Sequence, residues 1–139
     1  MSDQPYLEAV KQQYEDFPYP PRDPADEARR LWLATSGNLL IINHHCFGGT
    51  RDFRKGFRTL VAGAGTGDSV IFLAEQLRHY AAEVVYLDLS AASREIAEAR
   101  ARVRQLTNIT WITGSIMELP RLGLGEFDYI ECCGVLHHL

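Results

Sequence analysis

The amino-acid sequence predicts an α/β fold in which a parallel sheet is covered by helices on both faces. From residue 58 onward, short apolar segments alternate with segments whose apolar residues recur at helical spacing. The short apolar segments are continuous and do not alternate with polar residues, as expected for strands buried on both faces of a parallel sheet. Residues 1–57 lack this pattern, and we expect them to form a segment that precedes the α/β domain at residues 58–139.

The first part of this N-terminal segment is expected to be helical and then extended. The stretch DFPYPPRDP at residues 16–24 contains four prolines. Since proline fixes φ and lacks an N–H, we expect this stretch to be extended. Tyr14 precedes this stretch and Tyr19 lies within it, and these two tyrosines either pack it down or form part of a lid over a ligand. The helix is expected at residues 4–15, with one face formed by Tyr6, Leu7, Val10 and Tyr14.

A second N-terminal helix is predicted from Asp23 and Pro24, which are suited to the N-cap and first helical positions. We expect this helix to continue until just before Gly37. The apolar stretch LLII at residues 39–42 is expected to pack against the sheet.

The regular part of the chain contains four predicted strands and two predicted helices. Ser90 is the expected cap of the second helix. The strands are expected at residues 59–63, 82–90, 108–113 and 127–133, and the helices at residues 68–80 and 90–106.

The overall composition indicates a soluble cytoplasmic protein of one domain. A formal net charge of −4 argues against a nucleic-acid binder, which is usually basic. The chain has three cysteines, an odd number that does not suit a disulfide framework and favours a reducing compartment. No apolar run is long enough to cross a membrane, and the N-terminus does not resemble a signal peptide.

The turn after the first predicted strand reads GAGTGDS and carries the clearest functional signal. Its glycines, Gly63, Gly65 and Gly67, allow a sharp turn and a close approach of a ligand to the backbone. The loop opens a helix, so we expect its free N–H groups to face the ligand. Asp88 ends the next strand, where a carboxylate can accept both hydroxyls of a ribose.

Two adenosine cofactors fit this description, namely NAD and S-adenosylmethionine. Dinucleotide-binding loops favour the pattern G-x-G-x-x-G, but Asp68 stands where the third glycine would fall. A carboxylate there would repel a pyrophosphate. The observed G-x-G-x-G pattern therefore favours S-adenosylmethionine.

Over about residues 58–139, the sequence resembles the class I S-adenosylmethionine-dependent methyltransferases. The resemblance depends on four stretches in the expected order: VAGAGTGDS, VVYLDLS, GSIMELP and FDYIECCGVLHHL. The N-terminal QQYEDFPYP also resembles a segment that precedes this domain in some bacterial methyltransferases. The resemblance implies a Rossmann-like sheet with strand order 3-2-1-4.

The resemblance also implies roles for individual residues. Asp88 would hold the ribose diol, Leu89 would pack on the adenine, and Ser115 and Ile116 would lie at its edge and face, although Leu89 and Ile116 equally suit a core. The methionine end of the cofactor would be contacted by Gly63, Ala64, Gly65 and Gly67, and the sulfonium by the backbone of Cys132 and Cys133.

Two positions depart from the family pattern. The family usually has Asp or Glu two residues before the first glycine, where this chain has Val61. The position beside the adenine is commonly Asp, whereas here it is Ser115, which accepts a hydrogen bond but carries no charge. Both departures bear on how tightly the cofactor binds.

Methyl transfer requires few catalytic groups, because the sulfonium already makes the methyl group electrophilic. A general base is needed only where the acceptor is protonated. His137 and His138 are the candidate catalytic residues, because they follow the fourth strand, and ligands bind beyond the carboxyl ends of such strands. Alternatively, one histidine caps a helix and the other packs. No metal site is expected.

The favoured function is methyl transfer from S-adenosylmethionine to a small-molecule acceptor. The alternatives are a non-catalytic cofactor-binding fragment of a larger methyltransferase and, less favoured, an NAD-linked oxidoreductase. In the order 3-2-1-4 the fourth strand is an edge, and a complete fold of this class would have further strands. We therefore expect a domain truncated after the fourth strand, with possible self-association through that exposed strand.

Overall fold

The computed structural model describes residues 5–138, except for the side chain of His138. Within this part of the chain, four parallel strands form one sheet in the order β3-β2-β1-β4. This sheet confirms the predicted fold class and strand order. The strands are β1 (Phe57–Ala62), β2 (Ala82–Asp88), β3 (Ile109–Thr113) and β4 (Tyr129–Glu131).

Two helices connect the first three strands, as the sequence predicts. Helix α3 (Asp68–Leu77) begins directly after the glycine loop, and α4 (Ala91–Val103) follows β2. The side chain of Ser90 accepts a hydrogen bond from the N–H of Ser93 at 3.0 Å, which confirms its role as a helix cap.

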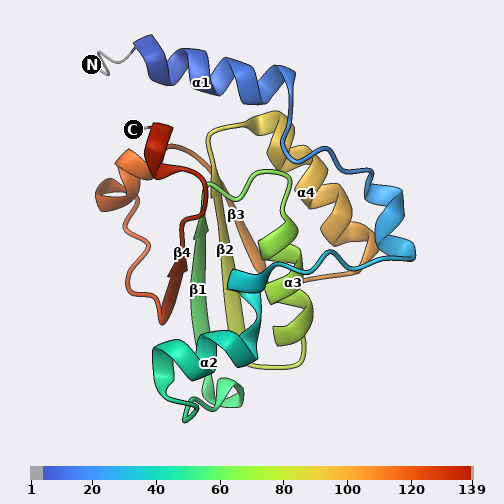
Figure 1. The fold of residues 1–139 in the computed structure, drawn as a ribbon, viewed down its shortest axis with the longest axis vertical. Coiled ribbons are helices and arrows are strands. Elements are labelled where there is room, and N and C mark those ends of the chain that lie inside the picture. Colours follow the sequence, from blue (N-terminus) through green and yellow to red (C-terminus); the bar gives the residue numbers. More distant parts are fainter. Residues whose placement is uncertain (1–4, 139) are drawn as a thin grey trace.

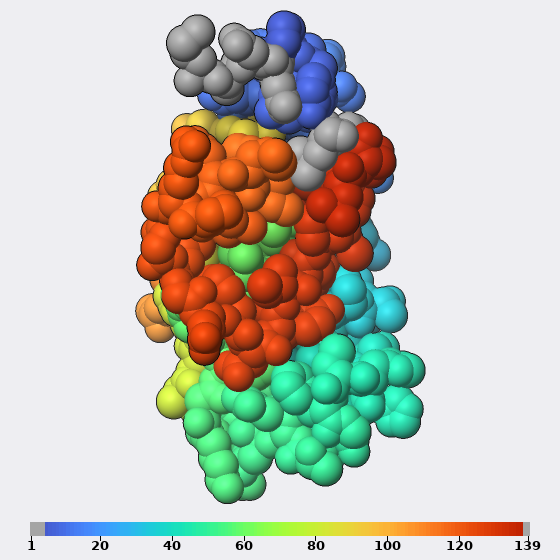
Figure 2. Space-filling view, turned by 90° about the vertical axis from the view of Figure 1, so that its left-hand side faces the viewer, coloured from blue at the N-terminus to red at the C-terminus, as the bar shows by residue number. Residues whose placement is uncertain are grey.

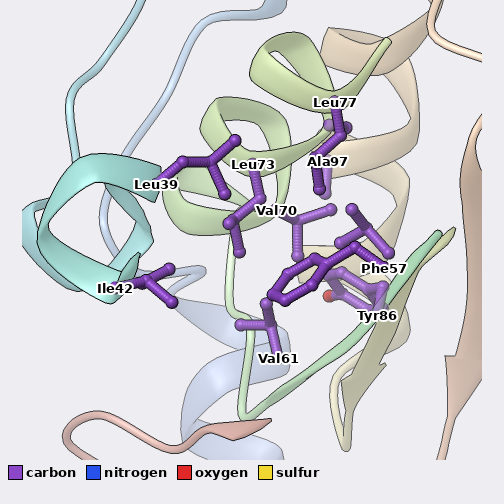
Figure 3. Close-up of a cluster of buried hydrophobic side chains, with 11 residues drawn as sticks. Leu39, Ile42, Phe57, Val61, Val70, Leu73, Leu77, Tyr86 and Ala97 are labelled. Atoms are coloured by element: carbon purple, nitrogen blue, oxygen red, sulfur yellow. The ribbon is translucent and has the colours of Figure 1, made fainter. Parts of the chain in front are cut away.

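The main hydrophobic core lies between the sheet and the helices α2 (Leu39–Phe47), α3 and α4 (Figure 3). Leu39 and Ile42 belong to this core, so the LLII stretch packs toward the sheet as expected, although it does so as part of a helix. Helix α2 of the N-terminal segment therefore shares a core with the α/β domain. The other members of the cluster are Phe57, Val61, Val70, Leu73, Ala74, Leu77, Val84, Tyr86 and Ala97.

The opposite face of the sheet is covered differently. A second apolar cluster lies there, formed by residues of β1 and β2 and by the connection from β3 to β4. In the described residues this connection forms the 3-10 helix η4 (Ile116–Arg121) and a loop, where helices were expected on both faces. Pro120, Gly123 and Gly125 explain the difference, because proline and glycine disfavour a longer α-helix.

This covering leaves a hollow. Figure 2 shows it between the orange segment that contains η4 and the red segment that contains β4, with green residues visible at its base. The hollow is lined by Leu60, Leu119, Pro120, Gly123, Leu124, Gly125, Phe127 and Ile130.

Helix α1 (Pro5–Asp16) confirms the first predicted helix. It lies across the end of the sheet toward which the arrow of β1 points, near η5 (Leu136–His138) (Figure 1). The carboxyl ends of the strands therefore face α1. The short helix η3 (Phe53–Lys55) directly precedes β1.

The second predicted N-terminal helix is wrong beyond its first turns. Asp23 caps a 3-10 helix, η1 (Pro24–Ala28), but the chain then leaves the helical conformation until η2 (Thr35–Gly37). Trp32 explains the interruption, because its ring is contacted by both Arg22 and Arg30, whose guanidinium carbons lie 3.8 Å from the ring centroid. These side-chain contacts outweigh local helix propensity.

Among the helices of residues 5–138, none is long and apolar enough to cross a membrane.

Candidate functional site

The glycine loop joins β1 to α3, and a side chain at each of its three glycines would collide with a different neighbour. All three have positive φ, which L-residues with a side chain rarely adopt. A Cβ at Gly63 would lie 2.0 Å from Val135 Cγ2, and one at Gly65 would lie 2.6 Å from the carbonyl oxygen of Tyr19. At Gly67 it would lie 2.8 Å from the Cβ of Ala97, so this glycine lets α3 and α4 approach each other.

The N–H groups of residues 63–67 were expected to be free and to face a ligand. They instead donate hydrogen bonds within the protein. Those of Gly63 and Ala64 donate to the carbonyl oxygen of Leu87, at 2.8 and 3.1 Å. The next three N–H groups donate to Asp88, Tyr19 and Ala64. The expectation is wrong for residues 63–67 because closing the tight turn uses these donors. A pyrophosphate cradled by the loop amides is therefore disfavoured.

Asp88 holds the two loops of the site together. One carboxylate oxygen accepts the N–H of Gly65 at 2.7 Å, and the other accepts the N–H of Ser90 at 2.9 Å. The carboxylate thus ties the glycine loop to the turn between β2 and α4. Each oxygen keeps further acceptor capacity, so Asp88 can still bind a diol.

The environment of Asp88 changes its acidity. Burial disfavours the charged form and raises the pKa of the carboxyl above its ordinary value, although the backbone N–H groups of Ser90, Gly65 and Leu89 act in the opposite direction. The hydroxyl of the neighbouring Tyr86 donates to the carbonyl oxygen of Gly65 at 2.8 Å, and burial raises the pKa of that phenol. Tyr86 therefore holds the loop as a neutral hydrogen-bond donor.

A cavity of about 460 Å³ lies at the carboxyl ends of the strands. Its volume is in the range of small-molecule and cofactor sites. Eight of the predicted cofactor-binding residues line it: Gly63, Ala64, Gly65, Asp88, Leu89, Ser115, Ile116 and Cys133.

The remaining predicted residues lie elsewhere or at the margin. Gly67 packs on Ala97 and does not line the cavity, and Cys132 packs with the second apolar cluster on the opposite face of the sheet. Burial raises the pKa of the Cys132 thiol, helped by the charges of its neighbours. His137 lines the cavity, whereas the side chain of His138 lies outside the described part of the structure.

Ser115 has a structural task beside its predicted role. Its hydroxyl oxygen accepts the N–H of Met117 at 3.1 Å, and Glu118 accepts the N–H of Ser115 at 2.9 Å, which forms a capping box at η4. The hydroxyl hydrogen of Ser115 is not used in this box, so Ser115 can act as a donor toward the cavity.

The N-terminal segment contributes a wall of the cavity. Leu7, Val10 and Tyr14 of α1 line it together with Tyr19 and Pro20. Sequence reasoning placed the first three on one helical face, and it left the role of Tyr14 and Tyr19 open between packing of the proline stretch and a lid. The structure brings this face to the cavity.

Hydrogen bonds attach this segment to both loops of the site. The Thr66 hydroxyl donates to the carbonyl oxygen of Pro20 at 2.6 Å. The Glu15 carboxylate accepts the N–H groups of Ala91 and Ala92, at 2.5 and 3.2 Å, at the N-terminus of α4. A carboxylate is favourable there because it satisfies unpaired amides and faces the positive end of the helix dipole.

Asp68 is not an isolated charge beside the ligand, contrary to the reasoning that opposed it to a pyrophosphate. It pairs with Arg22 at 2.6 Å and with the buried Arg100 at 2.8 Å. Burial alone would raise the pKa of Asp68, but the two arginines outweigh it and lower the pKa. Because the arginines compensate the charge of Asp68, that charge does not disfavour a dinucleotide. The loop N–H groups disfavour it, since they are already occupied by bonds within the protein.

Three further polar residues near the cavity were not singled out from the sequence. Glu131 of β4 and Ser69 of α3 line the cavity, and Ser36 of η2 donates to the Glu131 carboxylate at 2.9 Å. Glu131 had one sequence signal, because it is a charged residue between Ile130 and Cys132 in the predicted strand. The serines had none, since they meet Glu131 only in the folded chain.

The residues present fit S-adenosylmethionine. A half-buried carboxylate at Asp88 suits the ribose hydroxyls, and the lining is largely apolar around Leu89 and Ile116, as an adenine requires. The glycine loop brings backbone close to the cavity without offering amides to a phosphate. When bound, this cofactor supplies an electrophilic methyl group.

Comparisons with known proteins agree with this fit. A family model described as a methyltransferase domain matches residues 60–139. An uncharacterized protein of Synechococcus sp. is 31% identical over 133 residues, which cover 95% of this chain, and the chain spans 31% of the length of that relative.

Solved structures show the same relation. PKMT2 from Rickettsia typhi in complex with AdoHcy matches with a TM-score of 0.55 and 26% identity, over 85% of this chain and 21% of that protein. Cofactor-bound Rv0187 from MTB matches with a TM-score of 0.54 and 19% identity, over 94% of this chain and 53% of that protein, which shows the fold alone. The chain therefore belongs to the class I S-adenosylmethionine-dependent methyltransferases.

Proposed function

We propose that this chain binds S-adenosylmethionine in the cavity at the carboxyl ends of its strands and transfers the methyl group to a small-molecule acceptor. The observation that carries the proposal is Asp88, a half-buried carboxylate that lines the cavity beside the glycine loop. It accepts the ribose hydroxyls, and Leu89 and Ile116 contact the adenine. Ser115 donates to the adenine edge.

The other end of the cofactor lies beside the glycine loop. Gly63, Ala64 and Gly65 contact the methionine portion, and the backbone of Cys133 lies near the sulfonium. Gly67 supports this arrangement indirectly, because it allows α4 to pack against α3. Positioning of the acceptor and exclusion of water supply most of the acceleration.

His137 is the candidate general base. It is supported by its place in the cavity wall, close in sequence to Cys133. A base acts only on an acceptor that carries a proton at the reacting atom. A His137→Gln variant that loses a pH-dependent step in methyl transfer, with unchanged cofactor affinity, would support this role.

Residues 5–20 act as a lid over the cavity in this proposal. Support comes from the apolar face of α1 and from the hydrogen bonds of Glu15 and Thr66 that attach the segment to both loops. A lid of this kind excludes water and narrows the entrance, which suits a small acceptor better than a macromolecule. The cytoplasmic location and self-association through β4 stay predictions.

The first experiment measures cofactor binding. Isothermal titration with S-adenosylhomocysteine should show binding to the wild-type chain, and Asp88→Asn should weaken it at least about 10-fold, because charge-assisted hydrogen bonds to the ribose are lost. The matched control is Asp26→Asn, which removes a partly exposed carboxylate outside the cavity and should leave the affinity unchanged. Equal affinities of wild type and Asp88→Asn would contradict the assigned ribose site.

The second experiment concerns the acceptor. The protein is incubated with S-adenosylmethionine labelled in the methyl group and with either the low-mass or the protein fraction of a cell extract. Label should enter the low-mass fraction. Transfer only to the protein fraction would reject a small-molecule acceptor, and binding without any transfer would favour the non-catalytic alternative.

A further inference from the structure

A buried carboxylate without a cationic partner lies in the wall of the cavity. Glu131, the last residue of β4, is 6% exposed and lines the cavity. Its oxygens accept hydrogen bonds from the hydroxyls of Ser36 at 2.9 Å and Ser69 at 2.5 Å. Among residues 5–138, no lysine, arginine or histidine forms an ion pair with it.

The contacts of Glu131 within the protein do not fully offset the free-energy cost of burying its carboxylate. Removing a carboxylate from water is costly, and neutral hydroxyl donors offset only part of that cost. Buried charges in proteins are normally paired with an opposite charge. The nearby acidic residue Asp68 follows that rule, since two arginines contact it. The position of Glu131 in the cavity wall therefore points to a cationic group of a ligand.

The sheet register places this carboxylate beside the glycine loop. Glu131 is the register partner of Val61, two residues before Gly63. Register partners in a sheet point to the same face and lie about 5 Å apart. Val61 occupies the position where the family usually has an acidic residue, so this chain carries a carboxylate at the same level of the sheet, one strand to the side.

The strand order separates the two carboxylates of the cavity. Asp88 ends β2 and Glu131 ends β4, and β1 with its glycine loop lies between them. S-adenosylmethionine carries its ribose and its amino-acid group at opposite sides of the sulfonium. With the ribose on Asp88, as proposed, the amino-acid group would lie toward β4, on the other side of β1.

We propose that Glu131, held by Ser36 and Ser69, binds the α-ammonium group of the cofactor. This inference rests on the proposed placement of the ribose on Asp88. The two hydroxyls orient the carboxylate, and the ammonium supplies the positive charge that it lacks within the protein. Glu131 is then a determinant of cofactor recognition contributed by β4.

The test compares two ligands that differ in one group. S-adenosylhomocysteine has the α-ammonium, and its deaminated analogue keeps the adenosine and the carboxylate but lacks the amine. Wild-type protein should bind the aminated ligand about 10- to 100-fold more tightly, as for a charge-assisted hydrogen bond. Glu131→Gln should lose most of that preference by weakening only the aminated ligand. The matched control Glu126→Gln, on the exposed loop before β4, should preserve it.

Each outcome decides the proposal. Equal wild-type affinity for both ligands would overturn it without any variant, and so would equal weakening of both by Glu131→Gln, which would indicate a purely structural role. Unchanged affinity in Glu131→Gln for both would assign the carboxylate to another cation, such as a cationic acceptor. Weakening of S-adenosylmethionine but not of its product would assign it to the sulfonium.

Failure of the proposed function gives a different result. If the wild-type protein binds neither ligand, the cofactor site at Asp88 is wrong and the inference falls with it. If binding depends on Asp88 but not on Glu131, only the inference is wrong. Circular dichroism of Glu131→Gln before and during thermal unfolding establishes whether that variant is folded.

Discussion

The ion pair between Glu27 and Arg100 joins the N-terminal segment to α4 and gives a quantitative prediction. Nε of Arg100 donates to Glu27 at 2.7 Å, and the two side chains are 0% and 1% exposed. Glu27 also pairs with Arg104, and Arg100 also pairs with Asp68 at 2.8 Å. Breaking a buried pair from one side costs about 3–5 kcal/mol. Because Arg100 keeps Asp68 as a partner, we expect Glu27→Gln to cost about 3 kcal/mol.

Urea unfolding at pH 7, followed by circular dichroism, measures this change. With a slope of about 2 kcal/mol per M, the midpoint should fall by about 1.5 M. The matched control is Glu98→Gln, which removes the partner of Arg94 in a more exposed pair on the same helix. That change should cost only about 0.3–0.5 kcal/mol. If the midpoint of Glu27→Gln falls no further than that of the control, the buried pair does not stabilise the fold as argued.

Three further predictions follow from the site and the sheet edge. In Gly65→Ala, a Cβ 2.6 Å from the Tyr19 carbonyl oxygen should displace the N-terminal segment, so limited proteolysis of residues 17–23 should become faster than in wild type; an unchanged rate contradicts this. Burial raises the pKa of Asp88, so its carboxylate should become protonated at a higher pH than an ordinary aspartate. Titration calorimetry should therefore show that S-adenosylhomocysteine binding weakens as the pH falls through this range, and that Asp88→Asn lacks this pH dependence. Ile130 is 56% exposed on the edge strand β4, so Ile130→Lys should lower the sedimentation coefficient of a self-associating wild type; identical sedimentation argues against pairing through this edge.

The success of sequence reasoning differed between the two halves of the chain. The strands and the helices α3 and α4 were predictable because continuous apolar runs, a helical apolar period and the Ser90 cap are local signals. The predicted helix after Asp23 had an equally good local start but ended at Ala28. Its course is decided by Trp32 and Glu27, whose partners lie in distant or non-helical parts of the fold.

The candidate site shows the same division. Asp88 and the glycines were identified from spacing, but their contacts were not, because the N–H of Gly65 reaches Asp88 only when β1 and β2 are paired. Gly67 was assigned to the ligand and instead packs against Ala97. Sequence spacing marks where a glycine is required but does not distinguish a ligand from a neighbouring helix.

The sequence by itself determined the strands and helices of residues 58–139 and the loops at the carboxyl ends of the strands that form the candidate site. These features depend on residues that are neighbours in the chain. Tertiary structure alone decided that α1 covers the cavity, that Asp68 is neutralised by Arg22 and Arg100, and that Glu131 lies beside Val61. The physical reason is that a buried charge or an apolar face is satisfied by whatever group packing brings to it. Those partners come from segments far apart in sequence, and they meet only when the sheet is assembled.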